Sequence, residues 1–129
     1  MVTGGYESGT GALSSVELWR ADGSHCNLPS LPGGRSRHTQ SRLLLCGSYH
    51  TSGTNTRNTC SKFSEGSWTT SHTLLSGRSN HLAWSSHPDG VLLIGGRNPP
   101  HGEFFKSTEL VSTSNSSTTV LFTLDSTIM

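Results

Sequence analysis

The chain has 129 residues, of which 30% are hydrophobic and 13% charged, and its net charge is +1. Abundant serine, threonine and glycine favour turns and short strands over helices. The low charge, without a Lys/Arg cluster, argues against nucleic-acid binding, and no apolar run approaches the roughly 20 residues that span a bilayer. We therefore expect an all-β chain with no nucleic-acid partner and no membrane span.

The first predicted unit covers about residues 1–34 and contains strands near Val2, over 16–20 and over 26–31. Gly4 and Gly5 follow the first strand, and Glu17 lies in the second. A strand that runs into two glycines indicates close backbone approach or a positive φ. No opening strand precedes Val2, so we expect the chain to begin inside a repeated unit.

The second predicted unit covers about residues 35–76, with strands over 43–45, over 59–63 and from Ser67 onward. Cys46-Gly47 takes the place of the glycine pair, and Trp68 opens the last strand. The segment between His38 and Leu43 is too short to match the first hairpin of the next unit.

The third predicted unit covers about residues 77–125, with strands over 80–85, 91–94, 107–111 and 118–124. A Pro-Asp-Gly turn over 88–90 separates the first two strands. The apolar run over 91–94 does not alternate, which is typical of a strand buried on both faces, and it ends on Gly95 and Gly96.

Two motifs recur along the chain. The second glycine positions, Gly5, Gly47 and Gly96, follow one another at intervals of 42 and 49 residues, which is the period of propeller blades. The pattern Gly-Arg-Ser-x-His occurs at 34–38 and again at 77–81. This repetition favours a bracing role for four residues, in which the arginines donate to backbone carbonyls. They are Arg35, His38, Arg78 and His81.

The segment from Gly77 to Val111 resembles the Kelch repeat, including its galactose-oxidase-like branch. In that family, a blade has Arg and often His before its first strand, apolar residues running into Gly-Gly, and a Glu in the third strand. A Trp opens the fourth strand, as Trp68 does here, whereas Cys26 stands at this place in the first unit. The matching Glu residues are Glu17 and Glu109.

The resemblance implies a partial β-propeller of about three four-stranded antiparallel blades, with the boundaries 1–34, 35–76 and 77–125. It also implies a non-catalytic scaffold that binds a protein partner through inter-strand loops. A closed ring of this kind has about six or seven blades. We therefore expect either further blades in a longer parent chain or self-association, because bare end faces are an aggregation liability.

The cysteines and one glycosylation motif bear on localisation. Cys46 and Cys60 are separated by 13 residues and can reach disulfide distance if they lie on paired antiparallel strands. The alternative is two reduced core cysteines. Asn115-Ser116-Ser117 is an N-glycosylation sequon. Together these features favour an extracellular or lumenal parent protein, with Cys26 left unpaired.

No motif predicts an enzyme, a metal site or a cofactor. His38 and His81 repeat, the other five histidines fall in predicted turns and loops, and neither the zinc-ligand spacings nor a nucleophile elbow occurs. The copper-radical site of the galactose-oxidase-like branch needs two tyrosines, two histidines and a cysteine. Tyr6 and Tyr49 stand without the ligand context of that site.

Two classes of binding function remain. Three loops join second to third strands, and the last of them carries Pro99, Pro100, Phe104 and Phe105, which could anchor a protein partner. The alternative for these phenylalanines is packing between blades. The other class is a propeller lectin or carbohydrate-active protein, for which the tryptophans would have to face solvent. These are Trp19, Trp68 and Trp84.

Overall fold

The computed structural model describes residues 1–41, 43–49, 57–98 and 102–123. Within these ranges all regular secondary structure is β-strand, and the strands form antiparallel sheets, two of them four-stranded. The predicted all-β class is therefore confirmed. The described residues contain no helix, and so none that could cross a bilayer.

The first sheet has three strands in the order β1-β4-β5. These are β1 (Val2–Thr3), β4 (Val16–Trp19) and β5 (His25–Leu28). A small hairpin of β2 (Tyr6–Glu7) and β3 (Gly11–Ala12) connects β1 to β4.

The second sheet has the order β6-β7-β8-β9, so each strand pairs with the next in sequence. Its strands are β6 (Thr39–Ser41), β7 (Leu44–Ser48), β8 (Arg57–Ser64) and β9 (Ser67–Thr73). The second strand lies further along the chain than the predicted 43–45. The segment after His38 is short, but it still forms the opening strand β6.

The third sheet repeats this meander in the order β10-β11-β14-β15. Its strands are β10 (Leu82–His87), β11 (Gly90–Ile94), β14 (Ser107–Ser112) and β15 (Thr118–Thr123). A hairpin of β12 (Arg97–Asn98) and β13 (Glu103–Phe104) lies between β11 and β14, where β2–β3 lies in the first sheet.

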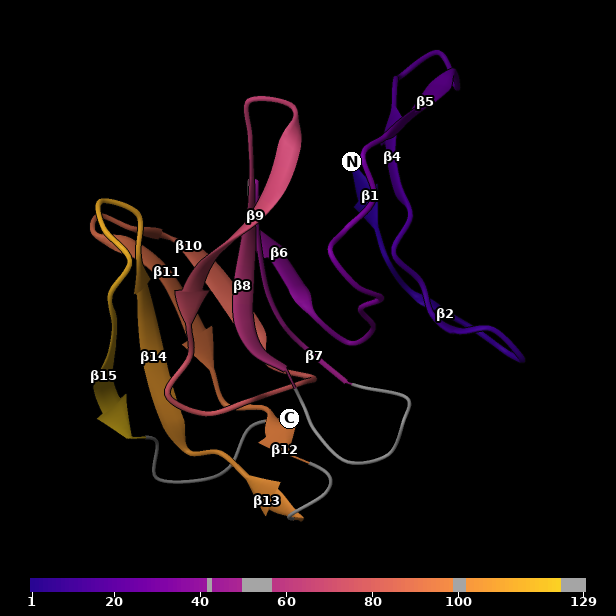
Figure 1. Cartoon of the computed structure of the whole chain (residues 1–129). Helices are drawn as coiled ribbons and strands as arrows, with labels where there is room; N and C mark the ends of the chain where they lie inside the picture. Colours follow the sequence, from indigo (N-terminus) through magenta and orange to yellow (C-terminus); the bar gives the residue numbers. More distant parts are fainter. Residues whose placement is uncertain (42, 50–56, 99–101, 124–129) are drawn as a thin grey trace.

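The three sheets follow one another in space as they do in sequence (Figure 1). The β2–β3 and β12–β13 hairpins extend toward the lower end in this view, while the β4–β5, β8–β9 and β14–β15 turns lie at the upper end. The first and third sheets therefore each present two different ends, one with an inserted hairpin and one with tight turns.

Two apolar clusters hold the sheets together. The cluster between the first and second sheets consists of Val16, Leu31, Leu45 and Trp68. The cluster between the second and third sheets consists of Cys46, Cys60, Leu74, Val91, Leu93 and Val111. The predicted double-sided burial of the 91–94 run also holds for its middle, because Leu92 is buried as well as its neighbours Val91 and Leu93.

The third sheet has an outward face that is buried at its centre, at Leu92, and apolar and exposed toward its edges. Leu93 packs in the cluster shared with the second sheet, so the next row of the sheet faces the other way. That row ends in Leu82 and Phe122, which are 54% and 47% exposed, and Trp84 on the same face is 49% exposed. The face of the second sheet that corresponds to it is covered by the third sheet.

Candidate functional site

Arg35 is buried and organises the second sheet from within. Its Nη1 donates to the carbonyl oxygens of Gly47 and Thr59, both at 2.9 Å, and its Nη2 donates to Thr59 Oγ1 at 3.0 Å and Ser61 Oγ at 3.1 Å. One guanidinium thus ties the end of β7 to the start of β8. Fixed donors of this geometry suit several acceptors at once.

Arg78 makes the same connections in the third sheet. Its Nη1 donates to the carbonyl oxygens of Gly95 at 2.7 Å and Ser107 at 3.2 Å, and its Nη2 donates to Ser107 Oγ at 3.1 Å. Nη2 also forms an ion pair with Glu109, and both side chains are buried. Burial lowers the pKa of Arg78, while the charge of Glu109 opposes that shift.

Glu109 also binds the segment that connects the second sheet to the third. Its carboxylate accepts hydrogen bonds from the backbone N–H groups of Leu75 at 2.9 Å and Ser76 at 3.2 Å. Glu17 holds the corresponding register position in the first sheet, opposite Val2 as Glu109 is opposite Leu93. It faces outward and accepts a bond from Trp19 Nε1 at 2.7 Å.

The arginine contacts correct the alignment of the glycine pairs. Because Arg35 and Arg78 donate to Gly47 and Gly95, Gly47 corresponds to the first glycine of each pair, not the second. Ser48 therefore takes the place of the second glycine. The glycine pair corresponds to Gly47-Ser48, and the predicted match to Cys46-Gly47 is wrong by one residue. The structural counterpart of Glu109 in the second sheet is Ser61, which the sequence analysis did not identify.

The first glycine of each pair is where one sheet meets the next. Gly4 and Gly47 have φ values of 58° and 67°, which favour glycine. A Cβ at Gly4 would lie 2.4 Å from the carbonyl oxygen of Arg35, and one at Gly47 would lie 2.3 Å from that of Arg78. The glycine of one sheet therefore makes room for the arginine backbone of the following one.

His38 and His81 lie at the same two junctions. His38 Nε2 is 3.1 Å from Thr3 Oγ1, and because that hydroxyl donates to Gln40 Oε1, Nε2 must be the donor. Burial, together with the positive charge of Arg35, lowers the pKa of His38 to about 4. Both histidines therefore brace contacts between sheets, since His81 Nε2 is likewise 2.7 Å from Thr39 Oγ1.

His81 is the more strongly perturbed of the two. Burial lowers its pKa to about 3, and the charges of Arg78 and His38 act in the same direction. A neutral imidazole with this pKa does not gain or lose a proton near neutral pH. Its position suits packing against Gly47, where an added Cβ would lie 2.7 Å from His81 Cε1.

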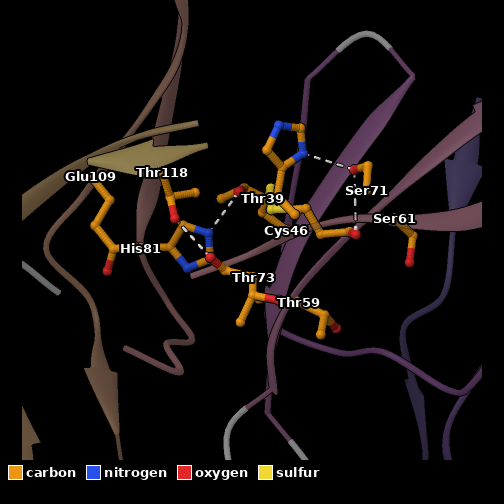
Figure 2. The surroundings of a disulfide bond; sticks show 12 residues. Thr39, Cys46, Thr59, Ser61, Ser71, Thr73, His81, Glu109 and Thr118 are labelled. Carbon is orange, nitrogen blue, oxygen red and sulfur yellow. Dashed lines mark hydrogen bonds between the residues drawn. A yellow bond between two sulfur atoms is a disulfide. The ribbon is translucent and has the colours of Figure 1, made fainter. Parts of the chain in front are cut away.

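The predicted disulfide is confirmed. Cys46 on β7 and Cys60 on β8 are directly opposite in the antiparallel register, with Cα atoms 4.1 Å apart, and their sulfurs are bonded. Figure 2 shows the bond among Thr39, Ser71 and His81, within the junction between the second and third sheets. Cys26 is a free, exposed cysteine.

The predicted partner-binding loop is only partly described. Pro99 and Pro100 lie outside the described residues. Phe104 is 46% exposed, whereas the Phe105 ring is half-buried and lies 4.8 Å from the guanidinium carbon of Arg78. Phe104 thus faces solvent, and Phe105 packs against Arg78. On the corresponding hairpin of the first sheet, Tyr6 is 63% exposed.

The three tryptophans occupy different environments. Trp68 is buried, tilts against Phe63, and donates to the carbonyl oxygen of Pro29 at 3.0 Å. Trp19 stacks on His25 at a centroid distance of 4.3 Å and is about half exposed, as Trp84 is. Trp68 therefore joins the first two sheets and is not available for stacking on a sugar.

A groove of about 770 Å³ separates the second and third sheets near the turn end. Its floor includes Leu44 and Val91. His72 forms part of its wall, and because its Nε2 faces the carbonyl oxygens of Ser112 at 2.7 Å and Asn115 at 2.8 Å, that nitrogen carries the proton. The hydroxyl-bearing residues of the groove are Ser41, Thr70, Ser71, Ser85, Ser86, Ser112, Thr113, Ser114 and Ser116.

His72 is a structural residue that sequence reasoning missed. The histidines outside the repeated motif were expected in turns and loops, but His72 lies in β9 and clamps the β14–β15 turn of the next sheet. Alternation along the strand could not have found it, because a shift in register between Thr70 and His72 turns His72 toward the third sheet while Trp68 packs on the first. His25 and His87 also lie in strands.

Among the described residues, no three His, Cys, Asp or Glu side chains gather as they would around a metal ion. No protein-family model matches the sequence, and no curated protein matches it. The function must therefore be argued from the geometry of the chain itself.

Proposed function

We propose that this chain is a segment of a Kelch-type β-propeller that acts as a non-catalytic scaffold for a protein partner. The observation that carries the proposal is the buried arginine of the second and third sheets. In both sheets it bonds the carbonyl of a positive-φ glycine and the backbone of the third strand. The same polar network in two successive meanders supports a repeat architecture.

The stacking of the sheets supports the same conclusion. The first sheet is covered by the second and the second by the third, each time through a glycine, an arginine backbone and a histidine. The outward face of the third sheet, with Leu82, Trp84 and Phe122, presents the apolar surface that another sheet of this kind would cover. Repeat arrays bury their cores in this sequential way.

The non-catalytic part of the proposal rests on how the polar side chains are used. The guanidinium groups of Arg35 and Arg78 hold strands together, the imidazoles of His38 and His81 pack at junctions, and Glu109 closes the entrance to its sheet. A histidine with a pKa of about 3 or 4 is a poor general base at neutral pH.

We propose the hairpin end of the sheets as the partner surface. Tyr6 on β2 and Phe104 on β13 both expose an aromatic ring, and their two hairpins lie toward the same end in Figure 1. Exposed aromatic side chains supply the large contact area that dominates many protein interfaces. At the opposite end, the β14–β15 turn carries hydroxyl-bearing side chains and no aromatic ring.

Site-specific photo-crosslinking of the full chain tests this surface. A photoreactive phenylalanine replaces Tyr6 or Phe104, and the matched control replaces Glu65, which is exposed in the β8–β9 turn at the other end. We expect the two hairpin positions to capture the same protein from an extract of the producing cells, and Glu65 to capture none. Equal capture from all three positions, or none from the hairpins, would contradict the proposal.

Carbohydrate binding is a second candidate, favoured by the groove between the second and third sheets. Its many hydroxyls can both donate and accept, and Ser41 Oγ is buried there without a hydrogen-bond partner. A sugar hydroxyl would satisfy that atom. Saturation-transfer NMR with galactose, glucose and N-acetylglucosamine tests this candidate, and a signal that Ser41→Val removes would support it.

A further inference from the structure

The Asn115-Ser116-Ser117 triplet lies at the tip of the β14–β15 turn. All three residues are exposed, and the sequence contains no other Asn-X-Ser/Thr triplet. The turn belongs to the upper end of the molecule in Figure 1, away from the β12–β13 hairpin of the same sheet. A group attached to the Asn115 side chain would project into solvent.

The turn is held by main-chain groups together with Ser112 Oγ and Asn115 Oδ1, and none of these bonds uses Asn115 Nδ2. The carbonyl oxygen of Asn115 accepts from His72 Nε2 at 2.8 Å, and its N–H donates to Ser112 Oγ at 3.3 Å. Its side-chain Oδ1 accepts from the N–H of Ser117 at 2.8 Å. This last bond brings Asn115 and Ser117, the two defining residues of the sequon, together.

The disulfide supplies an independent observation about the compartment. Cys46 and Cys60 are bonded and fully buried in the junction between the second and third sheets. Disulfides of this kind persist in secreted proteins and in the lumen of the secretory pathway. Glycosylation of Asn-X-Ser/Thr belongs to the same environment.

We propose that Asn115 is an N-glycosylation site. In the transfer, Asn115 Nδ2 attacks C1 of an oligosaccharide carried on a polyprenyl diphosphate. The new N–C1 bond forms as the C1–O bond to the diphosphate breaks, Nδ2 loses one proton, and the polyprenyl diphosphate leaves with the bonding electron pair. The hydroxyl of Ser117, whose backbone N–H donates to Asn115 Oδ1, is the element of the acceptor that the transferring enzyme requires.

The proposal does not rest on the proposed partner surface. A glycan on Asn115 would cover the rim of the groove, which Asn115 lines, and would leave the hairpins with Tyr6 and Phe104 uncovered. It is therefore compatible with a protein partner at the hairpin end. It would compete with a sugar ligand in the groove.

The test uses the full chain directed into the endoplasmic reticulum of cultured cells by a cleavable signal sequence. We expect a mass increase of one N-glycan, which peptide N-glycosidase removes to leave aspartate at position 115. Asn115→Gln and Ser117→Ala should abolish the increase. Ser116→Ala is the matched control and should retain it, because the middle residue of the triplet is free to vary.

A second measurement shows whether the glycosylated molecules are folded. The glycosylated fraction should also resist thiol alkylation at Cys46 and Cys60 before reduction, which shows that the glycan is tolerated by the native junction. The proposal is overturned if the chain carries no glycan, if the glycan survives Asn115→Gln, or if it occurs only on molecules whose Cys46 and Cys60 are alkylated.

Discussion

The second and third sheets share one architecture but are held by different chemistry. In the second, Arg35 is surrounded by neutral oxygens of Gly47, Thr59 and Ser61, and a disulfide links the paired strands next to it. In the third, Arg78 is paired with a buried carboxylate. At the register of the disulfide, the third sheet has Ile94 opposite Thr108.

The difference shows that the two sheets keep the same hydrogen-bonding and packing positions but fill them with different side chains. In each sheet an arginine donates to equivalent backbone carbonyls, and a pair of side chains on opposite strands packs beside it. The last hydrogen-bond acceptor of the arginine can be a hydroxyl or a carboxylate. The cross-strand pair can be a disulfide or Ile with Thr. The energetic consequences differ, because one solution buries two charges and the other adds a covalent link.

The largest expected effect comes from removing the ion pair in the third sheet. Arg78→Met leaves the Glu109 carboxylate buried without its cation, which costs about 3–5 kcal/mol of the free energy of unfolding. Arg35→Met removes the donors to Gly47, Thr59 and Ser61, which are neutral acceptors, and should cost less. Urea unfolding of both variants measures the difference, and Arg78→Met with Glu109→Leu should recover part of the loss. Equal losses for the two arginines would contradict this account.

The disulfide of the second sheet can be replaced by the pair that its neighbour uses. Cys46→Ile with Cys60→Thr keeps the space filled but loses the link, so we expect a loss of about 3 kcal/mol from loop-closure entropy. Cys26→Ser is the matched control and should leave the unfolding midpoint unchanged, since Cys26 is exposed and free. A midpoint that does not move in the Ile–Thr variant would show that the bond does not limit the unfolded chain.

The junction glycine gives a smaller but more selective effect. Gly47→Ala forces a Cβ against the backbone of Arg78, so it combines the cost of a positive φ with overpacking, together about 2–5 kcal/mol. Gly66→Ala meets nothing within 4 Å at a φ of 80° and carries only the first cost, about 1–2 kcal/mol. Thermal unfolding of the two variants separates the cost of the positive φ from the cost of overpacking. A larger loss of stability for Gly66→Ala would refute the close contact of Gly47 with Arg78.

The effect that is smallest near neutral pH, and that grows as pH falls, is a pH dependence carried by the junction histidines. The pKa of His81 is about 3 in the folded chain, against an ordinary value of 6.5. Between these values the unfolded chain binds a proton that the folded chain does not, so stability is lost as pH falls below about 6.5. The loss is at most about 1.4 kcal/mol per pH unit for each histidine.

His81→Gln should flatten this dependence, and His25→Gln is the matched control because His25 is exposed on the first sheet. The residual slope of the His81 variant reports His38, whose contribution ends near pH 4. The measurement is the urea midpoint between pH 7 and pH 4. Unchanged slopes in the His81 variant would show that another group carries the dependence.

Local patterns in the sequence predicted most of the strands. The non-alternating run at 91–94, the Pro-Asp-Gly turn before it and the 43-residue repeat of Gly-Arg-Ser-x-His all mark short-range requirements of backbone and burial. The Cys46–Cys60 bond was predictable for the same reason, since a strand pair joined by one loop brings opposite residues together.

Contacts between sheets were beyond such patterns. The place of Ser61 as the counterpart of Glu109, the shift of the second glycine position to Ser48, and the clamp from His72 to the β14–β15 turn depend on which residues meet across long stretches of chain. Phe105 and Phe104 are adjacent and chemically alike, yet one packs under Arg78 and the other faces solvent. Strand β13 ends at Phe104, and the position of Arg78, from a distant part of the sequence, decides which of the two rings is covered.

The sequence by itself determined the all-β class, the repeat and the positions of most strands, because each of these depends on residues close together in the chain or on a fixed period. It left the Cys46–Cys60 bond as one of two alternatives, which the structure decided. Only the tertiary structure decided how the polar groups are used. Whether Arg78 finds a carboxylate, whether His81 is buried enough to stay neutral, and whether an apolar face is covered are set by packing between sheets. The free energies of burial and desolvation that govern these outcomes exist only once distant segments have come together.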